Sequence, residues 1–230
     1  MTIVEEKSLQ EAQKLTTLLQ WLGKHHFLTS PVQATITGEM VTQYAGKPVF
    51  VKKWISGAVY ENFSTDELGQ IGNSIAHLHQ IPVPDYLPKY HPYGQQVFSS
   101  VIGKGIDTEY EKWLKERFQF LKKHVPEDLP RGLVHGDIFF DNVLFENNKI
   151  KAIIDFEEAC NYYLIFDLGM GILGLCRTGG KIDLNKARAL IRGYEQIRSL
   201  GVTERDSLQL FIEYAAIATS WWRFWKYNIH

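Results

Sequence analysis

Hydrophobic residues recur every three to four positions through long stretches of the chain, the spacing that places side chains on one face of a helix. In residues 8–25 this face consists of the leucines at positions 15, 18, 19 and 22. Residues 65–79 begin at Thr65 and Asp66, which are typical of helix starts, and again carry one apolar face. We expect four further helices, in residues 107–124, 166–176, 184–199 and 203–227.

Shorter apolar runs between the first two helices have the length of strands. Residues 33–36, 40–44 and 48–54 are predicted to be extended, with Gly38 and Gly46 separating them. The chain thus predicts short strands near its start and a helix-rich remainder.

A distinctive group of polar residues follows Pro130, in the sequence HGDIFFDNVLF, a short basic spacer and then KAIIDFEEA. Asp137 stands five residues before Asn142, and Asp155 ends the apolar run 150–154, where a strand would return it to the same place. Phosphoryl transfer depends mainly on positioning and electrostatic stabilisation. Asp137 is suited to accept the proton of an acceptor hydroxyl, whereas Asn142 and Asp155 offer the oxygen ligands that Mg²⁺ prefers. The pattern predicts magnesium-dependent phosphoryl transfer.

Taken singly, these residues have a simpler interpretation. Asp and Asn are common turn formers, so Asp141 and Asn142 would only shape the turn before a strand in residues 143–145. Their joint occurrence with Asp155 favours the phosphate site. His135 is expected to brace the loop by hydrogen bonding, because the reaction needs no second base beside the catalytic aspartate.

With these residues the chain resembles the kinase-like phosphotransferases of small molecules, the aminoglycoside phosphotransferase and choline kinase superfamily. Their catalytic loop has the pattern His-x-Asp-x4-Asn and precedes a metal-binding Asp. Within this superfamily the chain most resembles type II homoserine kinases. The likeness covers residues 30–228 and includes DLPRGLVHGDIFFDNVLF, IIDFEEACNYYLIFDL, Cys176 and KARALIRGYEQIR.

The resemblance implies an α+β fold of the protein-kinase type, ATP and Mg²⁺ as cofactors, and a small-molecule hydroxyl as substrate. It implies that Asp137 is the catalytic residue and that Asn142 and Asp155 are the metal ligands. Asp167, in FDLGMG, matches a family aspartate that ties down the catalytic loop. An N-cap of the following helix is an equal interpretation of Asp167, and the two roles are compatible.

The order of predicted elements also follows that family. It implies a remnant of the N-terminal lobe with the hinge in residues 1–57, and a helical C-terminal lobe with the catalytic and metal-binding loops in residues 58–230. Backbone groups of Lys53, Trp54 and Ile55 would then bond the adenine edge. An ordinary edge strand is the alternative, because backbone recognition leaves little trace in sequence.

The start of the chain departs from the family pattern, which begins with a nucleotide-covering hairpin and a strand carrying a phosphate-binding Lys. Residues 1–7 are too few for both, and Glu11 matches the family's Glu without its Lys, so we expect Glu11 to be a solvated charge. GKG at residues 103–105 predicts a turn, since it lacks the P-loop pattern. We expect either a shortened piece of an ordinary kinase, which the intact loop favours, or a short form that binds nucleotide without turnover.

Composition agrees with an ordinary soluble protein. The 230 residues are 45% hydrophobic and 22% charged, enough to bury a sizeable core. A formal net charge of −1 gives no basic surface for nucleic acid, and no signal peptide or bilayer-length apolar stretch is present, so neither nucleic acid nor membrane is an expected partner. Cys160 and Cys176 lack metal-ligand spacing and are predicted to be buried thiols in a reducing cytoplasm.

The acceptor is harder to predict than the reaction, because acceptor pockets of this fold come from variable helices. Homoserine is the first choice, and its carboxylate would need a cation: Arg177, Arg192 and Arg223 are candidates, or all three are surface charges. Glu157 and Glu158 could meet its ammonium group or form a solvated turn. GILGL before Cys176 differs from the Asn and Trp that homoserine kinases carry there.

Other acceptors remain open. The tail aromatics Trp221, Trp222, Phe224, Trp225 and Tyr227 could surround choline by cation–π attraction, although residues 221 and 225 share a helical face that favours core packing. An aminoglycoside would favour an acidic cleft, and the last hundred residues hold no dense acidic run. A nucleotide-binding module without turnover is the alternative from another class.

Overall fold

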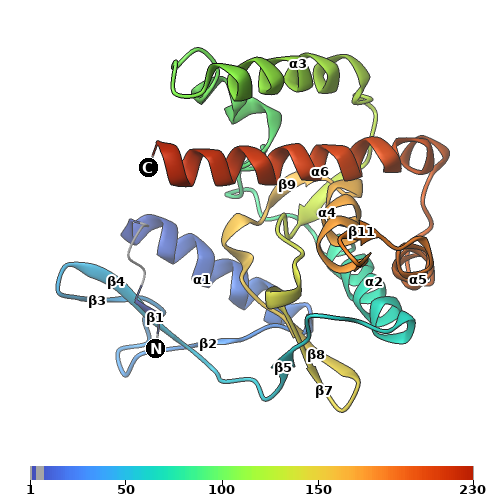
Figure 1. Cartoon of the computed structure of the whole chain (residues 1–230). Coiled ribbons are helices and arrows are strands. Elements are labelled where there is room, and N and C mark those ends of the chain that lie inside the picture. Colours follow the sequence, from blue (N-terminus) through green and yellow to red (C-terminus); the bar gives the residue numbers. More distant parts are fainter. Residues whose placement is uncertain (1, 4–7, 230) are drawn as a thin grey trace.

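The computed structural model describes residues 2–3 and 8–229. It has a thin N-terminal part, in which one helix lies beside short strands, and a larger helical part (Figure 1). The N-terminal elements are β1 (Thr2–Ile3), α1 (Leu9–Lys24), β2 (Val32–Gln33), β3 (Thr42–Tyr44) and β4 (Lys47–Lys52). The elements that follow are β5 (Ala58–Val59), α2 (Thr65–His79), η1 (Gln95–Ser100), α3 (Thr108–His124), β6 (Arg131–Val134), η2 (Phe140–Asn142), β7 (Val143–Glu146), β8 (Lys149–Ile153), η3 (Phe156–Glu158), β9 (Cys160–Tyr163), α4 (Ile165–Leu175), β10 (Arg177–Thr178), β11 (Lys181–Ile182), α5 (Leu184–Glu195) and α6 (Val202–Asn228).

α1 begins at a complete capping box. The Ser8 hydroxyl oxygen accepts a hydrogen bond from the Glu11 N–H, and the Glu11 carboxylate accepts one from the Ser8 N–H, which satisfies two free donors at the helix start. The predicted leucine face is buried. The helix predicted in residues 8–25 is therefore confirmed, and Glu11, expected to be a solvated charge, is part of the cap.

β4 is the central strand of the N-terminal sheet and is antiparallel to β1, β2 and β3. The β3–β4 hairpin turns at Ala45 and Gly46, whose φ angles are 50° and 76°. The strands predicted in residues 40–44 and 48–54 are confirmed in shorter form. β4 thus holds the N-terminal strands together.

The strand predicted in residues 33–36 is wrong beyond Gln33. Thr35 accepts a hydrogen bond from the Gly38 N–H, and its own N–H donates to Glu39, so the chain folds into a turn instead of extending. Ile36 stands fully exposed at this turn. The glycine two residues later permits the left-handed backbone, with φ 88°, that the turn requires.

The helices predicted in the larger part are confirmed, and one end is misplaced. α5 ends at Glu195, four residues before the predicted end at residue 199. The N–H groups of Ile197 and Arg198 both donate to the Tyr194 carbonyl, which tightens the chain into a turn ahead of α6. The observed mixture of short antiparallel sheets and packed helices confirms the predicted α+β class. In the described part, no helix is long and apolar enough to cross a membrane.

Two glycine contacts bring α2 and α5 unusually close. A Cβ at Gly72 would overlap the Leu190 carbonyl, and a Cβ at Gly193 would overlap the Gly69 backbone. The helices therefore touch backbone to backbone at these points. The core continues through α4 and α6, which pack along each other, while α3 lies alongside α6 (Figure 1).

Two antiparallel ladders position the polar sequence after Pro130. β6 pairs with β9, with Val134 opposite Cys160, and β7 pairs with β8, with Val143 opposite Ile153. β5 pairs with β7 and so joins the second sheet. It lies just after residue 57, where the boundary between the two lobes is predicted, and that boundary stays a prediction. The ladders bring the segments ending at residue 134 and residue 153 to one region.

Candidate active site

The segment between β6 and β7 forms a loop that requires glycine at position 136. Gly136 has a φ of 86°, and a Cβ there would stand 2.5 Å from His91 Nε2 and 3.0 Å from the Glu158 carbonyl oxygen. Both the backbone angle and the space exclude a larger residue. This glycine sets the turn that presents Asp137.

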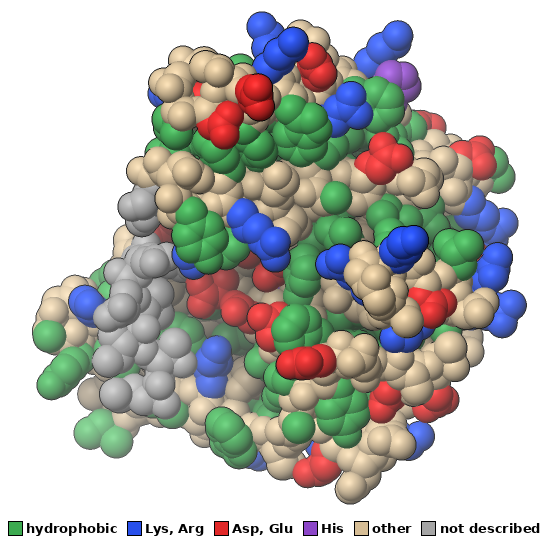
Figure 2. Space-filling view, viewed as in Figure 1, with side chains coloured by type: hydrophobic (Ala, Val, Ile, Leu, Met, Phe, Trp, Pro, Cys, Tyr) green, Lys and Arg blue, Asp and Glu red, His purple; other side chains and the backbone are tan. Residues whose placement is uncertain are grey.

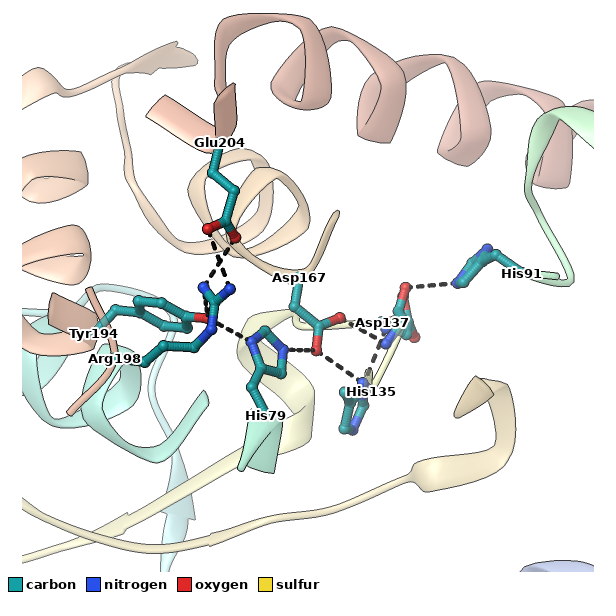
Figure 3. A network of polar contacts seen from close by, with 9 residues as sticks. His79, His91, His135, Asp137, Asp167, Tyr194, Arg198 and Glu204 are labelled. Carbon is teal, nitrogen blue, oxygen red and sulfur yellow. Dashed lines mark hydrogen bonds and ion pairs between the residues drawn. The ribbon is translucent and has the colours of Figure 1, made fainter. Parts of the chain in front are cut away.

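Asp167, in the first turn of α4, binds the loop through its carboxylate. Oδ2 accepts from the His135 N–H and Oδ1 from the Gly136 N–H, both at 2.8 Å, and His79 Nε2 donates to Oδ2 at 3.1 Å (Figure 3). Burial alone would raise the pKa of Asp167, but the hydrogen bonds from His79 and from the loop amides hold it below its ordinary value. The carboxylate is therefore a fixed anionic anchor.

His91 holds the same peptide from the other side. Its Nε2 donates to the Gly136 carbonyl oxygen at 3.1 Å, and its Nδ1 accepts from the Tyr93 N–H at 3.0 Å. These partners fix the neutral tautomer with the proton on Nε2. Complete burial lowers the pKa of His91 to about 4, which keeps the ring neutral near pH 7.

His135 ties the loop to the end of β8. Its Nδ1 accepts from the Asp137 N–H at 3.1 Å, and its Nε2 donates to the Ile154 carbonyl oxygen at 2.8 Å. The Ile154 N–H in turn donates to the Asn142 carbonyl oxygen at 2.9 Å. These bonds bring Asp155 near Asp137.

Asp137 lies half-buried in this loop. Burial raises the pKa of its carboxyl group; nearby His135 opposes this effect, and the negative charges of Asp155 and Asp141 add to it. Asn142 Nδ2 donates to the Asp137 carbonyl oxygen at 2.8 Å and to Oδ2 at 3.2 Å. The carboxylate thus has one oriented oxygen and a raised proton affinity, both useful to a group that accepts a hydroxyl proton.

Asn142 and Asp155 are the residues of this site that could hold a cation. Because the Asn142 amide nitrogen is engaged by Asp137, its Oδ1 is the atom left for a cation. Asp155 is exposed and has a φ of 67°, a left-handed conformation that is costly for a residue other than glycine. Among the described residues no group of three or more His, Cys, Asp or Glu side chains could hold a metal. The two oxygen ligands therefore suit Mg²⁺ only together with phosphate oxygens.

The predicted hinge residues lie at the end of β4. The Lys53 N–H donates to the Pro31 carbonyl at 2.8 Å, and its carbonyl accepts from Ser30 Oγ at 2.6 Å. These bonds occupy both backbone groups of Lys53. An adenine contact in this segment would therefore fall to Trp54, whose side chain is 86% exposed, and Ile55.

A cavity of about 230 Å³ opens beside Asp137. Its remaining walls come from Tyr93, from Phe139 to Asp141 in the loop, and from α6; the α6 residues are Thr219, Trp222 and Arg223. Figure 2 shows acidic side chains gathered in a hollow between the N-terminal part and the helices. A molecule in this cavity would meet the carboxylates of Asp137 and Asp141 and the guanidinium of Arg223.

The three candidate arginines occupy different places. Arg223 lines the cavity beside Asp137. Arg177 lies in the exposed β10–β11 hairpin, where it donates to the Gly180 carbonyl at 3.0 Å. Arg192 lines a larger groove of about 1090 Å³ between the end of α1, α2 and α5, which contains none of the predicted catalytic residues. Only Arg223 is placed to meet an acceptor at Asp137.

The two glutamates after Asp155, Glu157 and Glu158, also differ in burial. Glu158 is half-buried and accepts a hydrogen bond from the Tyr93 hydroxyl. Burial, followed by the charge of Glu158, raises the pKa of that tyrosine, so the hydroxyl keeps its proton. Glu157 is exposed. Tyr93 therefore connects the cavity wall to the acidic side of the site.

The tail aromatics do not converge on one point. Trp221 is 5% exposed and stacks on Trp225, with ring centroids 6.0 Å apart. Phe224 stacks on Tyr110 of α3 at 4.1 Å. Trp222 alone of this cluster lines the cavity beside Asp137. The favoured interpretation of residues 221 and 225 as core packing is thus the observed arrangement.

Sequence reasoning missed His79, His91 and Tyr93, which lie far from the motif in sequence. His79 closes α2 in the sequence LHQ, and His91 sits in a proline-rich loop, so neither stands in a local pattern. The signal that remains is compositional: histidines among apolar residues that must find hydrogen-bond partners when buried. Sequence alone does not name those partners.

Comparisons with known proteins agree on the fold and the reaction type. Homoserine kinase of Phenylobacterium zucineum is 26% identical over 221 residues, which are 93% of this chain and 67% of that protein. Homoserine kinase of Brucella canis is 27% identical over 213 residues, which are 87% and 64%. The chain thus spans about two thirds of the length of these relatives.

Solved structures share the fold at lower identity. The amicoumacin kinase hAmiN, in complex with AMP-PNP, Ca²⁺ and Ami, superposes with a TM-score of 0.74 at 14% identity, over 99% of this chain and 74% of that one. The microcompartment-associated aminopropanol kinase gives 0.70 at 16% identity, over 96% and 75%. These likenesses confirm the predicted kinase-like fold of aminoglycoside phosphotransferase type.

The family model of phosphotransferase enzymes matches residues 2–200. This range contains the loop with Asp137, the end of β8 with Asp155, and the anchor Asp167. It extends over most of the chain, from the N-terminal strands to the end of α5, and leaves out α6. The chain belongs to the phosphotransferase enzyme family.

Proposed function

We propose that the chain forms the catalytic part of an ATP-dependent kinase that phosphorylates a hydroxyl group of a small amino acid, with homoserine as the acceptor. One observation carries the proposal: the Gly136 peptide is held by Asp167 on its N–H side and by His91 on its carbonyl side, next to Asp137. A peptide held in this way fixes the direction of the following carboxylate before any substrate binds.

Asp137 would face the acceptor hydroxyl and take its proton as the oxygen attacks the γ-phosphorus of ATP. The raised pKa of this carboxyl group supports that role, because proton transfer is most effective when acid and base have similar strengths. Asn142 keeps one carboxylate oxygen in place through its amide N–H. The residue therefore orients the hydroxyl as well as accepting its proton.

Asn142 Oδ1 and the Asp155 carboxylate would hold Mg²⁺ together with the nucleotide. When bound, the cation neutralises phosphate charge and lowers the barrier to transfer. Trp54 and Ile55 would offer backbone groups to adenine, with Lys53 supporting the turn. In this proposal residues 1–57 belong to the N-terminal lobe and residues 58–230 form the C-terminal lobe.

The cavity beside Asp137 supports a small zwitterionic acceptor. At about 230 Å³ it is smaller than the roughly 300–1,000 Å³ of sites for drug-sized molecules, which disfavours an aminoglycoside. Arg223 could bind a carboxylate through two parallel hydrogen bonds, while Asp141 could bind an ammonium group. Relatives named homoserine kinase support this acceptor further.

The site of action is proposed to be a reducing compartment, the cytoplasm. Cys160 and Cys176 are both buried free thiols. Burial raises the pKa of Cys160 well above its ordinary value and that of Cys176 to about 12, so both stay protonated and unreactive. Their chemistry fits filling the core.

The test measures ADP formation from Mg²⁺-ATP with homoserine, choline and an aminoglycoside in parallel. We expect transfer to homoserine, and we expect Arg223→Met to raise the KM for homoserine about 10- to 100-fold because a charge-assisted hydrogen bond is lost. Arg177→Met, which removes an equivalent charge from the exposed hairpin, is the matched control and should leave the KM unchanged.

Each other outcome has a definite meaning. Transfer to choline, with the same KM in Arg223→Met as in the wild type, would mean that the acceptor is a cation held between Trp222 and Tyr93 and not a zwitterion. Nucleotide binding without transfer to any acceptor would show that this chain is a binding module, and the kinase proposal would be wrong.

A further inference from the structure

The carboxylate that anchors the catalytic loop is the end of a longer buried chain of polar contacts. From Asp167 the chain runs through His79 at the end of α2 to Tyr194 at the end of α5, with His79 Nδ1 and the Tyr194 hydroxyl 2.7 Å apart. It continues to Arg198, whose Nη1 lies 3.0 Å from the Tyr194 oxygen. Arg198 closes on Glu204 at the start of α6 by two bonds, of 2.9 and 3.1 Å (Figure 3).

With one proton on the His79 ring, the donors and acceptors in this chain can be arranged in one consistent direction. Arginine only donates, so Arg198 gives hydrogen bonds to Glu204 and to the Tyr194 oxygen. The Tyr194 hydroxyl hydrogen is then directed to His79 Nδ1. This leaves the proton of His79 on Nε2, where it faces the Asp167 carboxylate.

Little water reaches these groups. The side chains of His79 and Asp167 are 0% exposed, and those of Arg198 and Glu204 are 19% and 3% exposed. A buried donor or acceptor that loses its partner is not rescued by solvent. A change at one end of the chain therefore has to be accommodated by the groups along it.

The glycine contacts between α2 and α5 make the central link possible. A Cβ at Gly72 would overlap the Leu190 carbonyl and stand 2.8 Å from the Tyr194 backbone N, and Gly193 directly precedes that tyrosine. The close approach of the two helices thus lies beside the His79–Tyr194 hydrogen bond.

We propose that Tyr194 and the Arg198–Glu204 ion pair are positioning residues of the catalytic loop: they hold the His79 ring in the orientation in which Nε2 donates to Asp167, and so set the peptide that precedes Asp137. Asp167 Oδ2 is shared between His79 and the His135 N–H. If the Tyr194 hydroxyl is removed, His79 Nδ1 loses its hydrogen-bond donor in a buried site, while the Asp167 carboxylate still favours the proton on Nε2. The ring is then no longer held from its Nδ1 side, its bond to Asp167 weakens, and the carboxylate can shift away from the loop amides.

The proposal rests on the proposed function for its catalytic consequence, but its structural consequence can be measured without turnover. Tyr194→Phe is compared with Tyr162→Phe, which also removes a hydroxyl from a buried tyrosine, here one bonded to the Tyr214 hydroxyl at 2.7 Å. The first readout is the NMR shift and hydrogen exchange of the His135 and Gly136 amides. The second is kcat against KM for ATP.

We expect Tyr194→Phe to shift both amides, to speed their exchange, and to lower kcat about fivefold with KM for ATP unchanged. Tyr162→Phe should move neither readout. In a His79→Gln background, adding Tyr194→Phe should change the shifts and exchange rates of the two amides little further. The contact through which Tyr194 acts on Asp167 is already altered in that background.

The proposal would be overturned if the NMR shifts and exchange rates of the two amides were unchanged in Tyr194→Phe, or if they changed equally in Tyr162→Phe. Shifted amides with an unchanged kcat would also overturn it, since the link would not serve catalysis. Were the wild-type chain inactive with every acceptor, the kinase proposal would fail, whereas the amide readout alone would still decide whether Tyr194 positions the loop.

Discussion

The two sides of the candidate site are built very differently. On the side of Asp137, both polar groups of Gly136 have a buried partner, and those partners come from α4 and from the loop around His91. On the proposed nucleotide side, β4 ends in a segment where Trp54 is 86% exposed and Val51 is 44% exposed. The loop with Asp137 is therefore held in place by the helical part, while the segment after β4 is more exposed.

Because of this difference, we expect substitutions in the loop to lower the free energy of unfolding more than substitutions in the segment after β4. A loop held by many long-range partners loses several bonds when one anchor is removed. An exposed segment loses little when a side chain is trimmed. The two regions can therefore be compared by matched changes.

The largest expected effect is that of Asp167→Ala. It leaves the His135 and Gly136 N–H groups and His79 Nε2 without their acceptor in a buried site. We expect a loss of about 3–5 kcal/mol in the free energy of unfolding, measured by urea denaturation. A loss below about 1 kcal/mol would mean that the loop does not depend on this anchor.

A glycine-to-alanine pair compares the two regions directly. Gly136 and Gly46 both have positive φ, 86° and 76°, but only Gly136 has neighbours where a Cβ would stand. Gly46→Ala should cost about 1–2 kcal/mol from the backbone angle alone, and Gly136→Ala about 2–5 kcal/mol because the contact with His91 is added. Equal losses in thermal or urea unfolding would contradict the difference between the regions.

His91 predicts a pH dependence of stability. Its folded pKa of about 4 lies below its ordinary value of 6.5, so on acidification the unfolded chain takes up the proton first. Stability should be complete above pH 6.5 and fall by roughly 3 kcal/mol as the pH drops to about 4. His91→Gln can still donate to the Gly136 carbonyl oxygen but does not titrate, so its stability should fall less over this range; parallel curves would argue against a buried neutral histidine.

The smallest effect is expected at Trp54. Because its side chain is exposed and the proposed adenine contact uses the backbone, Trp54→Ala should change the free energy of unfolding by less than about 0.5 kcal/mol. KM for ATP should change less than about twofold, since the backbone groups remain. A much larger rise in KM would place the indole itself against the nucleotide.

The residues of the candidate site that could be predicted from sequence are those that lie close to one another along the chain. Asp137, Asn142 and Asp155 lie within one loop and hairpin, so their separations along the chain determine their approach in space. The helices in residues 65–79 and 203–227 were predictable because their apolar periodicity is long. Short strands were less so, since a single turn at Thr35 redirects the chain.

The partners of the loop could not be predicted in this way. His79 and His91 reach Asp167 and Gly136 across 88 and 45 positions in sequence, distances at which no local pattern specifies a contact. Likewise, Arg177, Arg192 and Arg223 were equivalent candidates until the packing of α6 placed one of them at the cavity. Side chains that depend on tertiary packing need the structure.

The most direct test of the central claim is the rate of phosphoryl transfer to homoserine by the wild-type chain and by Asp137→Asn, with ³¹P NMR to identify the phosphorylated product. Asp128→Asn, an exposed aspartate ahead of β6, is the control. We predict that Asp137→Asn lowers the rate roughly 10²- to 10⁴-fold while Mg²⁺-ATP still binds, and that the control changes nothing. An undiminished rate in Asp137→Asn would contradict the account.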